Sequence, residues 1–270
     1  MRVPRTYWDD FAPACGELGP PLRPSPEDLR FAEQTVAQMT APRVLMLGVT
    51  PRIADLRWPE GSRIVALDKS HSMTRTAWPG NLEGRRWVAC ANWLTPPLGR
   101  DSCDVVIGDG SINNIEFPGE FERLTCVAAS VLCESGRMIL RCYLQSDPAE
   151  SVDAVFDAAL AGQIGSFHTF KLRLLMAMQP SACAGVCVGD VYRTWANWGR
   201  RSLPGGPGWG PAAVATIEYY RDSTTRYAFP TKEELKGALF PRFELESYFQ
   251  PSYEFGERCP TLVLRPRRTA

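Results

Sequence analysis

Short apolar runs, each closed by a turn residue, recur along the first half of the chain. Runs of this length without polar interruption are typical of parallel strands that are buried on both faces of a sheet. The pattern therefore predicts five strands, over residues 43–47, 63–68, 86–91, 103–108 and 137–143.

Helices are predicted between these strands. Ser25 supplies an N-cap, Pro26 the first helical position, and two acids follow in the first turn, so a helix is expected from there to about Met39. A second helix is expected over 118–133. Strand and helix alternate, which predicts right-handed crossovers and a doubly wound sheet with its ligand edge at the carboxyl ends of the strands.

The pattern changes after Tyr143, where helical spacing replaces the strand runs. Thr231 begins a capping box for a helix that ends near Phe240. A Gly- and Pro-rich loop over 203–211 predicts a mobile connection or lid, because no strand precedes it and its prolines lack N–H donors. The remaining elements are helices over 147–162, 167–178 and 184–198, and an antiparallel hairpin over 243–249 and 261–264 that completes the sheet.

These elements predict one α/β domain in four parts. Residues 1–40 form an N-terminal segment and helix that cover the ligand site, and 41–145 form the ligand-binding half of the sheet. Residues 146–230 form a helical lid in which we expect substrate specificity, and 231–270 complete the sheet. With 270 residues, 44% of them hydrophobic, the chain can bury one core of this size.

The charge balance and the hydropathy of the chain argue against nucleic acid and membrane as binding partners. Lys plus Arg and Asp plus Glu both number 30, so the basic excess of a dedicated nucleic-acid binder is missing. No window approaches the length of a membrane span, and the first ten residues contain no apolar leader segment. We therefore expect a cytoplasmic protein with neither a nucleic-acid nor a membrane partner.

Cysteine and histidine usage predicts no metal site. The nine cysteines are odd in number, and in predicted core elements free cysteine acts as a small hydrophobic side chain. The cysteines in such elements are Cys90, Cys103, Cys126, Cys133 and Cys142. Cys183 and Cys187 lie one helical turn apart, but no second pair follows at metal-ligand spacing, and His71 and His168 are the only histidines.

The candidate chemistry begins at Gly48, which ends the first apolar run. Twenty residues later the second run ends in Asp68. A glycine turn followed at this distance by an acid is typical of a nucleoside site, in which the acid accepts hydrogen bonds from the ribose hydroxyls. Asp68 is the strongest candidate ligand residue.

The order of elements resembles that of the class I S-adenosylmethionine-dependent methyltransferases, over roughly residues 43–265. The resemblance is carried by Gly48, Asp68, the Ala91-Asn92-Trp93 end of the third strand, and the segment 105–111 after the fourth. It implies a Rossmann-like sheet of seven strands with an antiparallel last strand, S-adenosylmethionine as the cofactor and a transferase activity. The chain departs from the usual acid and three alternating glycines of the first loop, since Met46, Gly48, Thr50 and Arg52 stand there.

The resemblance also implies roles for individual residues. Gly48 and Thr50 would line the first loop, Asp68 would hold the ribose, and Asn92 with Trp93 would contact the adenine. Asp109 would face the transferring methyl or the amino-acid end and is the catalytic candidate, although it could also be a turn residue before Gly110. The full cofactor set is Gly48, Thr50, Asp68, Lys69, Asn92, Trp93, Asp109 and Ser111.

Four further residues are candidates for the substrate side. Tyr7 could face the sulfonium cation or anchor the N-terminus. Arg141 and Tyr143 end the fifth strand, and Arg141 could bind a carboxylate or form a structural salt bridge. His168 could act as a base, although its helical apolar neighbours favour a core position.

The function that the sequence favours is methyl transfer to a small-molecule acceptor. A variant uses the same cofactor without methyl transfer, by intramolecular attack that releases 5′-methylthioadenosine. A dinucleotide-dependent oxidoreductase should carry Gly-x-Gly-x-x-Gly at Gly48, which the chain lacks, and a non-catalytic scaffold is the remaining alternative. The aromatic residues Trp195, Trp198 and Trp209 could form a homodimer face, a substrate wall or a lid hinge.

Overall fold

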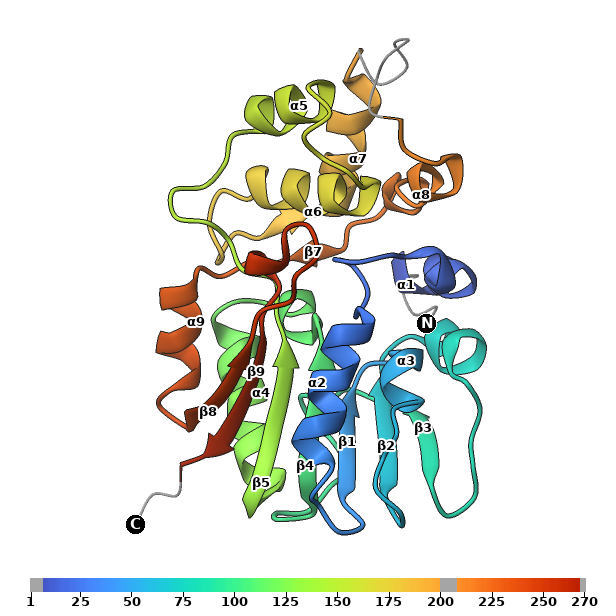
Figure 1. Cartoon of the computed structure of the whole chain (residues 1–270), viewed down its shortest axis with the longest axis vertical. Coiled ribbons are helices and arrows are strands. Elements are labelled where there is room, and N and C mark those ends of the chain that lie inside the picture. Colours follow the sequence, from blue (N-terminus) through green and yellow to red (C-terminus); the bar gives the residue numbers. More distant parts are fainter. Residues whose placement is uncertain (1–6, 200–207, 268–270) are drawn as a thin grey trace.

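A seven-stranded sheet carries a helical cap at one edge in the computed structural model, which describes residues 7–199 and 208–267 (Figure 1). The sheet consists of β1 Arg43–Leu47, β2 Arg63–Asp68, β3 Arg86–Cys90, β4 Cys103–Asp109, β5 Leu132–Arg141, β8 Phe243–Phe249 and β9 Thr261–Pro266. Their order is β3-β2-β1-β4-β5-β9-β8. Strands β1 to β5 are parallel, whereas β9 runs antiparallel between β5 and β8, so the predicted doubly wound sheet with a closing hairpin is confirmed.

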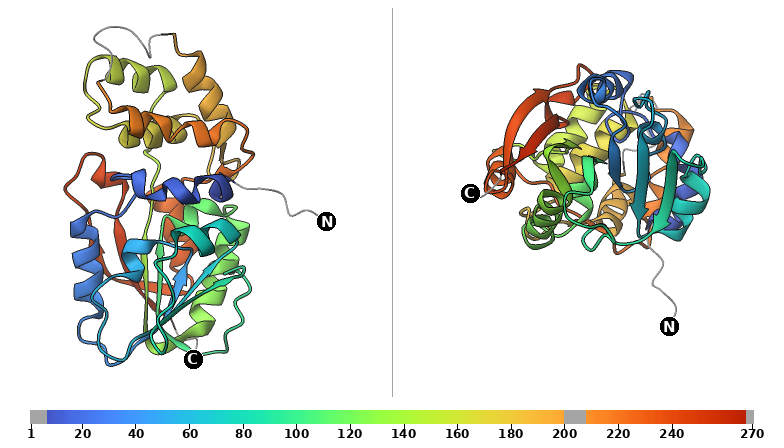
Figure 2. Two further views of the ribbon diagram at one scale, coloured as in Figure 1. Left: turned by 90° about the vertical axis from the view of Figure 1, so that its right-hand side faces the viewer. Right: turned by 90° about the horizontal axis from the view of Figure 1, so that it is seen from below.

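Successive residues of β1 point to opposite faces of the sheet, and both faces are covered by helices (Figure 2). Val44 and Met46 pack with residues of α2 (Pro26–Val36) and α3 (Pro51–Ala54). Leu45 and Leu47 pack on the other face with α4 (Gly119–Val131) and α9 (Lys232–Leu239). This double burial explains the apolar run of β1. Strand β3 lies at the edge of the sheet and is half-buried or exposed at every position, so the prediction that it is buried on both faces is wrong.

Two capping boxes fix helix starts that the sequence predicts. The Ser25 side chain accepts a hydrogen bond from Asp28 N, and the Asp28 carboxylate accepts one from Ser25 N. Thr231 and Glu234 make the equivalent pair at α9. Helix α2 ends at Val36, earlier than the predicted Met39.

Helices α5 (Val152–Leu160), α6 (Phe167–Ala177), α7 (Val188–Asn197) and α8 (Pro211–Ala215) form the cap, which stands above the carboxyl edge of the parallel strands in Figure 1. Its core is aromatic: Phe170 lies 5.5 Å from Trp195, 5.9 Å from Trp198 and 4.8 Å from Trp209, between ring centroids. The Trp209 indole N–H also donates to Ile164 O at 3.1 Å. The three tryptophans therefore stabilise the cap, and none of them lines the cavity described below, so the predicted role as a substrate wall is wrong. The alternatives of a homodimer face and a lid hinge stay predictions.

Several predicted boundaries need correction. Strand β5 begins at Leu132, well before residue 137, and α5 begins at Val152 because the Ser151 hydroxyl caps it by accepting from Ala154 N. The helix expected from 184 begins at Val188, since β6 (Val186–Cys187) first pairs antiparallel with β7 (Arg226–Tyr227). Residues 203–207 of the predicted lid loop lie outside the described residues.

The buried side chain of Asn113 hydrogen-bonds to the chain at both ends of the cap. Asn113 donates through Nδ2 to Tyr143 O at 2.9 Å and Ala228 O at 2.8 Å, and its Oδ1 accepts from Tyr143 N at 3.0 Å. It thereby fixes the chain both where it leaves the sheet and where it returns. Helix α1 (Tyr7–Phe11) and the 3-10 helix Ala12–Glu17 lie between cap and sheet (Figure 1).

The described residues contain no helix with the length and apolar composition needed to cross a membrane. All nine cysteines lie within the described ranges and are free thiols. Cys103 and Cys142 are buried as expected, but Cys90 and Cys126 are exposed, so the prediction that they fill the core is wrong.

Candidate functional site

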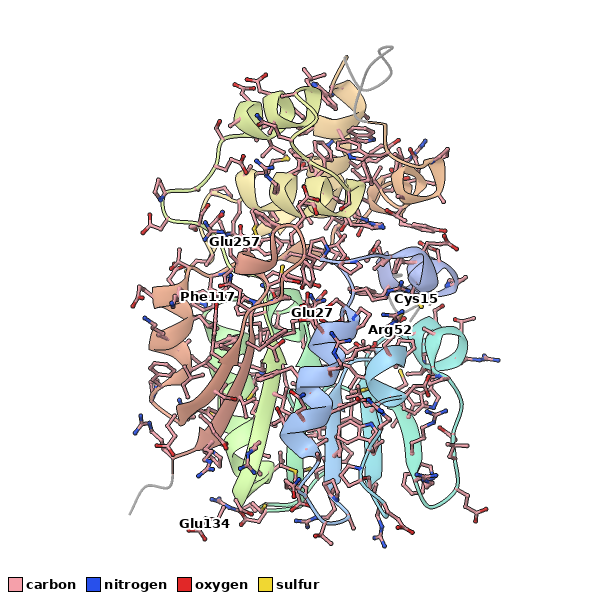
Figure 3. The ribbon with its side chains drawn as sticks, viewed as in Figure 1. Cys15, Glu27, Arg52, Phe117, Glu134 and Glu257 are labelled. Carbon is pink, nitrogen blue, oxygen red and sulfur yellow. The ribbon has the colours of Figure 1, made fainter. Side chains whose placement is uncertain are left out.

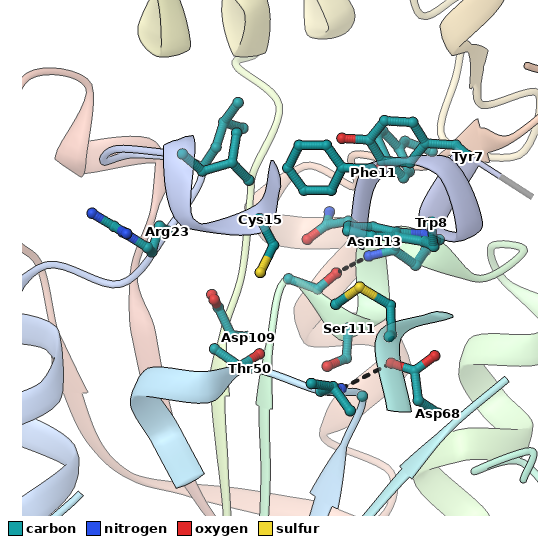
Figure 4. Close-up of a pocket in the computed structure, with 18 of the residues that line it drawn as sticks. Tyr7, Trp8, Phe11, Cys15, Arg23, Thr50, Asp68, Asp109, Ser111 and Asn113 are labelled. Atoms are coloured by element: carbon teal, nitrogen blue, oxygen red, sulfur yellow. Dashed lines mark hydrogen bonds between the residues drawn. The ribbon is translucent and has the colours of Figure 1, made fainter. Parts of the chain in front are cut away.

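A cavity of about 370 Å³ lies where the carboxyl ends of β1, β2 and β4 meet the cap and the N-terminal segment. Figure 4 shows Asp68, Thr50 and Asp109 on its sheet side, and Tyr7 and Phe11 on the opposite side. In Figure 3 this region is marked by Cys15 and Arg52, while Glu134 lies at the far end of the sheet. Clefts at this edge of an open α/β sheet are the usual ligand sites.

Gly48 forms the turn after β1 and has a φ of +87°, in the region that favours glycine. A Cβ at this position would lie 2.9 Å from Cζ3 of Trp93 and 3.6 Å from Oδ2 of Asp68. The absence of a side chain therefore lets the indole and the carboxylate approach the turn. Sequence reasoning brought these three residues together, and the structure places them side by side along the cavity.

The Asp68 carboxylate is held rigidly at the cavity wall. Its Oδ2 accepts from Val49 N and its Oδ1 accepts from Ser70 N, both at 2.8 Å. Each carboxylate oxygen can accept more than one hydrogen bond, so ligand hydroxyls can bond to Asp68 beside these backbone donors. The arrangement can bind a vicinal diol.

Two buried polar atoms on the sheet side have no hydrogen-bond partner within the described ranges. They are Nε1 of Trp93, a donor, and Oδ1 of Asn114, an acceptor, and both residues line the cavity. The Asn114 amide is oriented by its other end, since Nδ2 donates to Gly110 O at 2.7 Å. Buried polar groups are normally paired, so these two atoms fit a ligand that carries both an acceptor and a donor.

Arg23 and Arg52 also line the cavity, and within residues 7–199 and 208–267 neither forms an ion pair. Nη1 of Arg23 donates to Gly16 O at 2.9 Å, while its buried Nε has no partner. Burial, together with the positive charge of Arg52, lowers the pKa of Arg23. An anionic group bound between the two guanidinium groups would relieve this repulsion.

Asp109 lines the cavity, but its carboxylate is already paired. Oδ1 accepts from Nε of Arg141 at 2.7 Å, and both side chains are buried. Burial raises the pKa of Asp109, and the positive charge of Arg141 opposes that shift. A carboxylate held in this way can accept a further hydrogen bond but is a poor candidate for removing a proton.

The cap side of the cavity is aromatic and carries no charged side chain among its described lining residues. Tyr7 comes from α1, and the other contributions come from the cap and from the segment that returns to the sheet: Leu172, Leu175, Tyr220, Thr225, Tyr227 and Phe229. The cavity thus has a polar, charged end at the sheet and an apolar end at the cap.

Most of the predicted site residues border this cavity. They are Gly48, Thr50, Asp68, Lys69, Trp93, Asp109, Ser111, Tyr7 and Tyr143. Ser111 also has a structural bond, since its hydroxyl donates to Leu47 O at 2.7 Å. Their individual roles remain predictions.

Three predicted residues are not part of the cavity wall. Asn92 turns back on its own chain, where Oδ1 accepts from Leu94 N at 3.0 Å. Arg141 lies behind Asp109 as the salt-bridge partner, which was one of its two predicted roles. His168 is buried in α6 beside Gly19, and desolvation lowers its pKa to about 4, so it is a neutral residue in the core position that its helical neighbours favoured and not on the cavity wall.

Sequence reasoning missed several residues that line the cavity. Asn114 comes three positions after the recognised segment 105–111, so the polar residues that follow β4 were an available signal. Arg23, Tyr220 and Tyr227 reach the cavity through long-range packing of the N-terminal segment and cap, and local periodicity contains no signal for such contacts.

Comparison with known proteins identifies the fold. No protein-family model and no curated protein matches the chain. Among solved structures, it is similar to one described as a putative Zn-dependent alcohol dehydrogenase from Rhodobacter sphaeroides, with a TM-score of 0.62 and 13% identity over 97% of each chain.

Two methyltransferases are also similar. The CcbJ methyltransferase from Streptomyces caelestis has a TM-score of 0.56 and 16% identity, with 97% of this chain and 98% of that chain covered. A SAM-dependent methyltransferase from Methanosarcina mazei has a TM-score of 0.51 and 14% identity, with coverages of 90% and 98%. Together with the strand order, these similarities define the Rossmann-like fold of the class I methyltransferases.

The described residues contain no cluster of three or more His, Cys, Asp or Glu side chains that could hold a metal ion.

Proposed function

We propose that the protein is an S-adenosylmethionine-dependent methyltransferase that acts on a small-molecule acceptor. The observation that carries the proposal is the rigid Asp68 carboxylate beside Gly48, at the edge where β1 and β2 end in the cavity. This combination is what binding of a nucleoside cofactor at the strand ends requires.

The residues present fit such a cofactor from end to end. Asp68 would accept hydrogen bonds from the ribose hydroxyls, and the unpaired Trp93 N–H and Asn114 oxygen would pair with the base. Arg23 and Arg52 would hold the carboxylate of the amino-acid end. When bound, the cofactor supplies a methyl group activated by a sulfonium.

The chain itself contributes positioning and exclusion of water. Tyr7 and Phe11 close the cavity from the N-terminal side, and their ring faces favour a neighbouring cation. Asp109, which Arg141 keeps in place, would accept a hydrogen bond from the ammonium of the amino-acid end. Methyl transfer needs in-line alignment and a desolvated nucleophile, and well-oriented reactants can gain several kcal/mol, about 7–11, from proximity alone.

A dinucleotide-dependent oxidoreductase is the main competing function. A pyrophosphate needs a helix start with free backbone N–H groups. Helix α3 has four residues and begins at Pro51, which has no N–H. The geometry therefore favours a cofactor with one nucleoside and no pyrophosphate.

The proposal is tested by calorimetric titration with S-adenosylmethionine and S-adenosylhomocysteine, with NAD and NADP as controls. We expect micromolar binding of the sulfonium cofactor and its demethylated product, and none of the dinucleotides. Mass spectrometry of S-adenosylmethionine incubated with the protein separates the variants. 5′-Methylthioadenosine formed without an acceptor would indicate the non-methylating reaction. Cofactor binding with no methyl transfer to any member of a panel of small-molecule acceptors would indicate a scaffold.

A further inference from the structure

We propose that the cap end of the cavity is the acceptor site and that it binds an uncharged aromatic molecule bearing a hydrogen-bonding oxygen, recognised by the hydroxyls of Tyr7, Tyr220 and Tyr227. This inference rests on the proposed function, because it names the acceptor class of the same cavity. It is carried by three observations: the tyrosine hydroxyls, the aromatic wall and the distribution of charge.

The three tyrosines are nearly inaccessible to bulk solvent, with exposed fractions of 4%, 2% and 9%. They nevertheless line the cavity. The rings of Tyr7 and Tyr220 pack edge to face at 5.1 Å between centroids. Three phenol hydroxyls at one end of a cavity offer hydrogen-bond donors and acceptors to a ligand bound there.

The same hydroxyls remain neutral. Burial raises the pKa of all three tyrosines above the ordinary value for a phenol. Each hydroxyl can therefore both donate and accept a hydrogen bond. Such groups suit a phenol, a ketone or an amide oxygen.

The wall around these hydroxyls favours an aromatic ligand. Phe11 stacks on Tyr7 with centroids 5.1 Å apart and an interplanar angle of 15°, and Phe229 lies 6.3 Å from Tyr227. Leu172 and Leu175 complete the apolar surface. Aromatic pairs prefer stacked and edge-to-face contacts, both of which this surface offers.

Charge is confined to the other end of the cavity. The charged lining residues in the described chain are Arg23, Arg52, Asp68, Lys69 and Asp109, all on the sheet and N-terminal side. Lys171 lies 5.1 Å from the Tyr220 ring centroid but does not line the cavity, and its Nζ donates to the Thr216 hydroxyl at 2.9 Å. A charged acceptor would be buried without a counter-ion at this end, at a large cost.

The test uses three probes of one shape: 2-naphthol, naphthalene and 2-naphthoate. Their binding is followed by fluorescence, with and without saturating S-adenosylhomocysteine. We expect 2-naphthol to bind in both conditions and 2-naphthoate to bind at least about tenfold more weakly. Displacement of 2-naphthol by S-adenosylhomocysteine, or equal binding of the carboxylate, would overturn the proposal.

Matched variants isolate the hydroxyls. Tyr220→Phe combined with Tyr227→Phe should weaken 2-naphthol binding about tenfold and leave naphthalene binding unchanged. Tyr219→Phe is the control, because Tyr219 packs against Phe11 from the same segment as Tyr220 but does not line the cavity. Equal 2-naphthol affinity in the double variant and the control would refute the role of the hydroxyls.

The two proposals fail in different ways. If S-adenosylhomocysteine does not bind but 2-naphthol binding still depends on Tyr220 and Tyr227, the result supports the aromatic site and contradicts the methyltransferase proposal. If S-adenosylhomocysteine binds and 2-naphthol does not, the cofactor proposal stands and the acceptor class is wrong.

Discussion

Nε of Arg141 donates to Oδ1 of Asp109 at 2.7 Å, and the two side chains are only 4% and 8% exposed. The pair joins the ends of β4 and β5 directly below the cavity. The same guanidinium donates to Pro21 O at 2.9 Å and to the hydroxyl of Tyr253 at 3.0 Å. One buried cation therefore fixes the N-terminal segment, two strand ends and the loop between β8 and β9 around the site.

Arg141→Met should lower the free energy of unfolding by about 3–5 kcal/mol, because it leaves the Asp109 carboxylate buried and unpaired. Urea denaturation measures this loss. Adding Asp109→Asn to the variant should recover part of it, since the uncompensated charge is then removed.

Arg137→Met is the matched control on the same strand. Arg137 pairs with Glu246 at 2.8 Å at a partly exposed position, where such pairs contribute about 0–1 kcal/mol. Equal losses for the two arginine variants would show that burial of the Asp109 pair has no special effect on stability.

Strands β1, β2 and β4 could be predicted from the sequence because each of them is a local apolar run. The glycine turn, Asp68 and Trp93 could also be predicted, since each stands at or just after the end of a predicted strand. The exact start of β5 could not, because Gly136 and two polar neighbours interrupt the strand after Leu132.

The cap side of the site was beyond sequence reasoning for a physical reason. Tyr220 reaches the cavity only because the cap folds back over the sheet, and Arg23 only because the N-terminal segment crosses its edge. Asn92 satisfies the sequence pattern, yet its side chain is used in a local turn. The local pattern of apolar and polar residues identifies which residues end a strand. It does not show which partners their side chains hydrogen-bond to.

Replacing both Arg23 and Arg52 by Gln should weaken the binding of S-adenosylhomocysteine but not that of 5′-methylthioadenosine. We expect the affinity for S-adenosylhomocysteine to fall by about 1.5–3 kcal/mol, the range for a hydrogen bond to a charged group. The affinity for 5′-methylthioadenosine should not change, because this ligand has no carboxylate. Calorimetry measures both.

Arg30→Gln serves as the control, since Arg30 is exposed on α2 outside the cavity. If the double variant loses affinity for both ligands equally, the two arginines do not recognise the amino-acid end.

Lys171→Met should stabilise the protein most at low pH. Complete burial lowers the pKa of Lys171 to about 7, below the value of about 10.4 in an unfolded chain. The unfolded state thus binds more protons between these two values, so the destabilisation that Lys171 causes is full below pH 7 and fades as pH rises toward 10.

The advantage of the Met variant in urea denaturation should therefore shrink steadily from pH 6.5 to 9.5. His168, Thr216 and Tyr220 face Lys171, and they are unchanged in both proteins, so the difference isolates the lysine. A stability difference that does not vary with pH would contradict the buried, uncompensated amine.

The most direct test of the central claim is calorimetric titration of S-adenosylhomocysteine into the wild-type protein and into Asp68→Ala. Asp104→Ala is the control, because Asp104 is a carboxylate at the opposite end of β4 that pairs with Arg43. We predict micromolar binding to the wild type and the control, and a loss of about 1–3 kcal/mol in Asp68→Ala. Unchanged affinity in a folded Asp68→Ala protein, or no binding to the wild type, would contradict a nucleoside cofactor at the ends of β1 and β2.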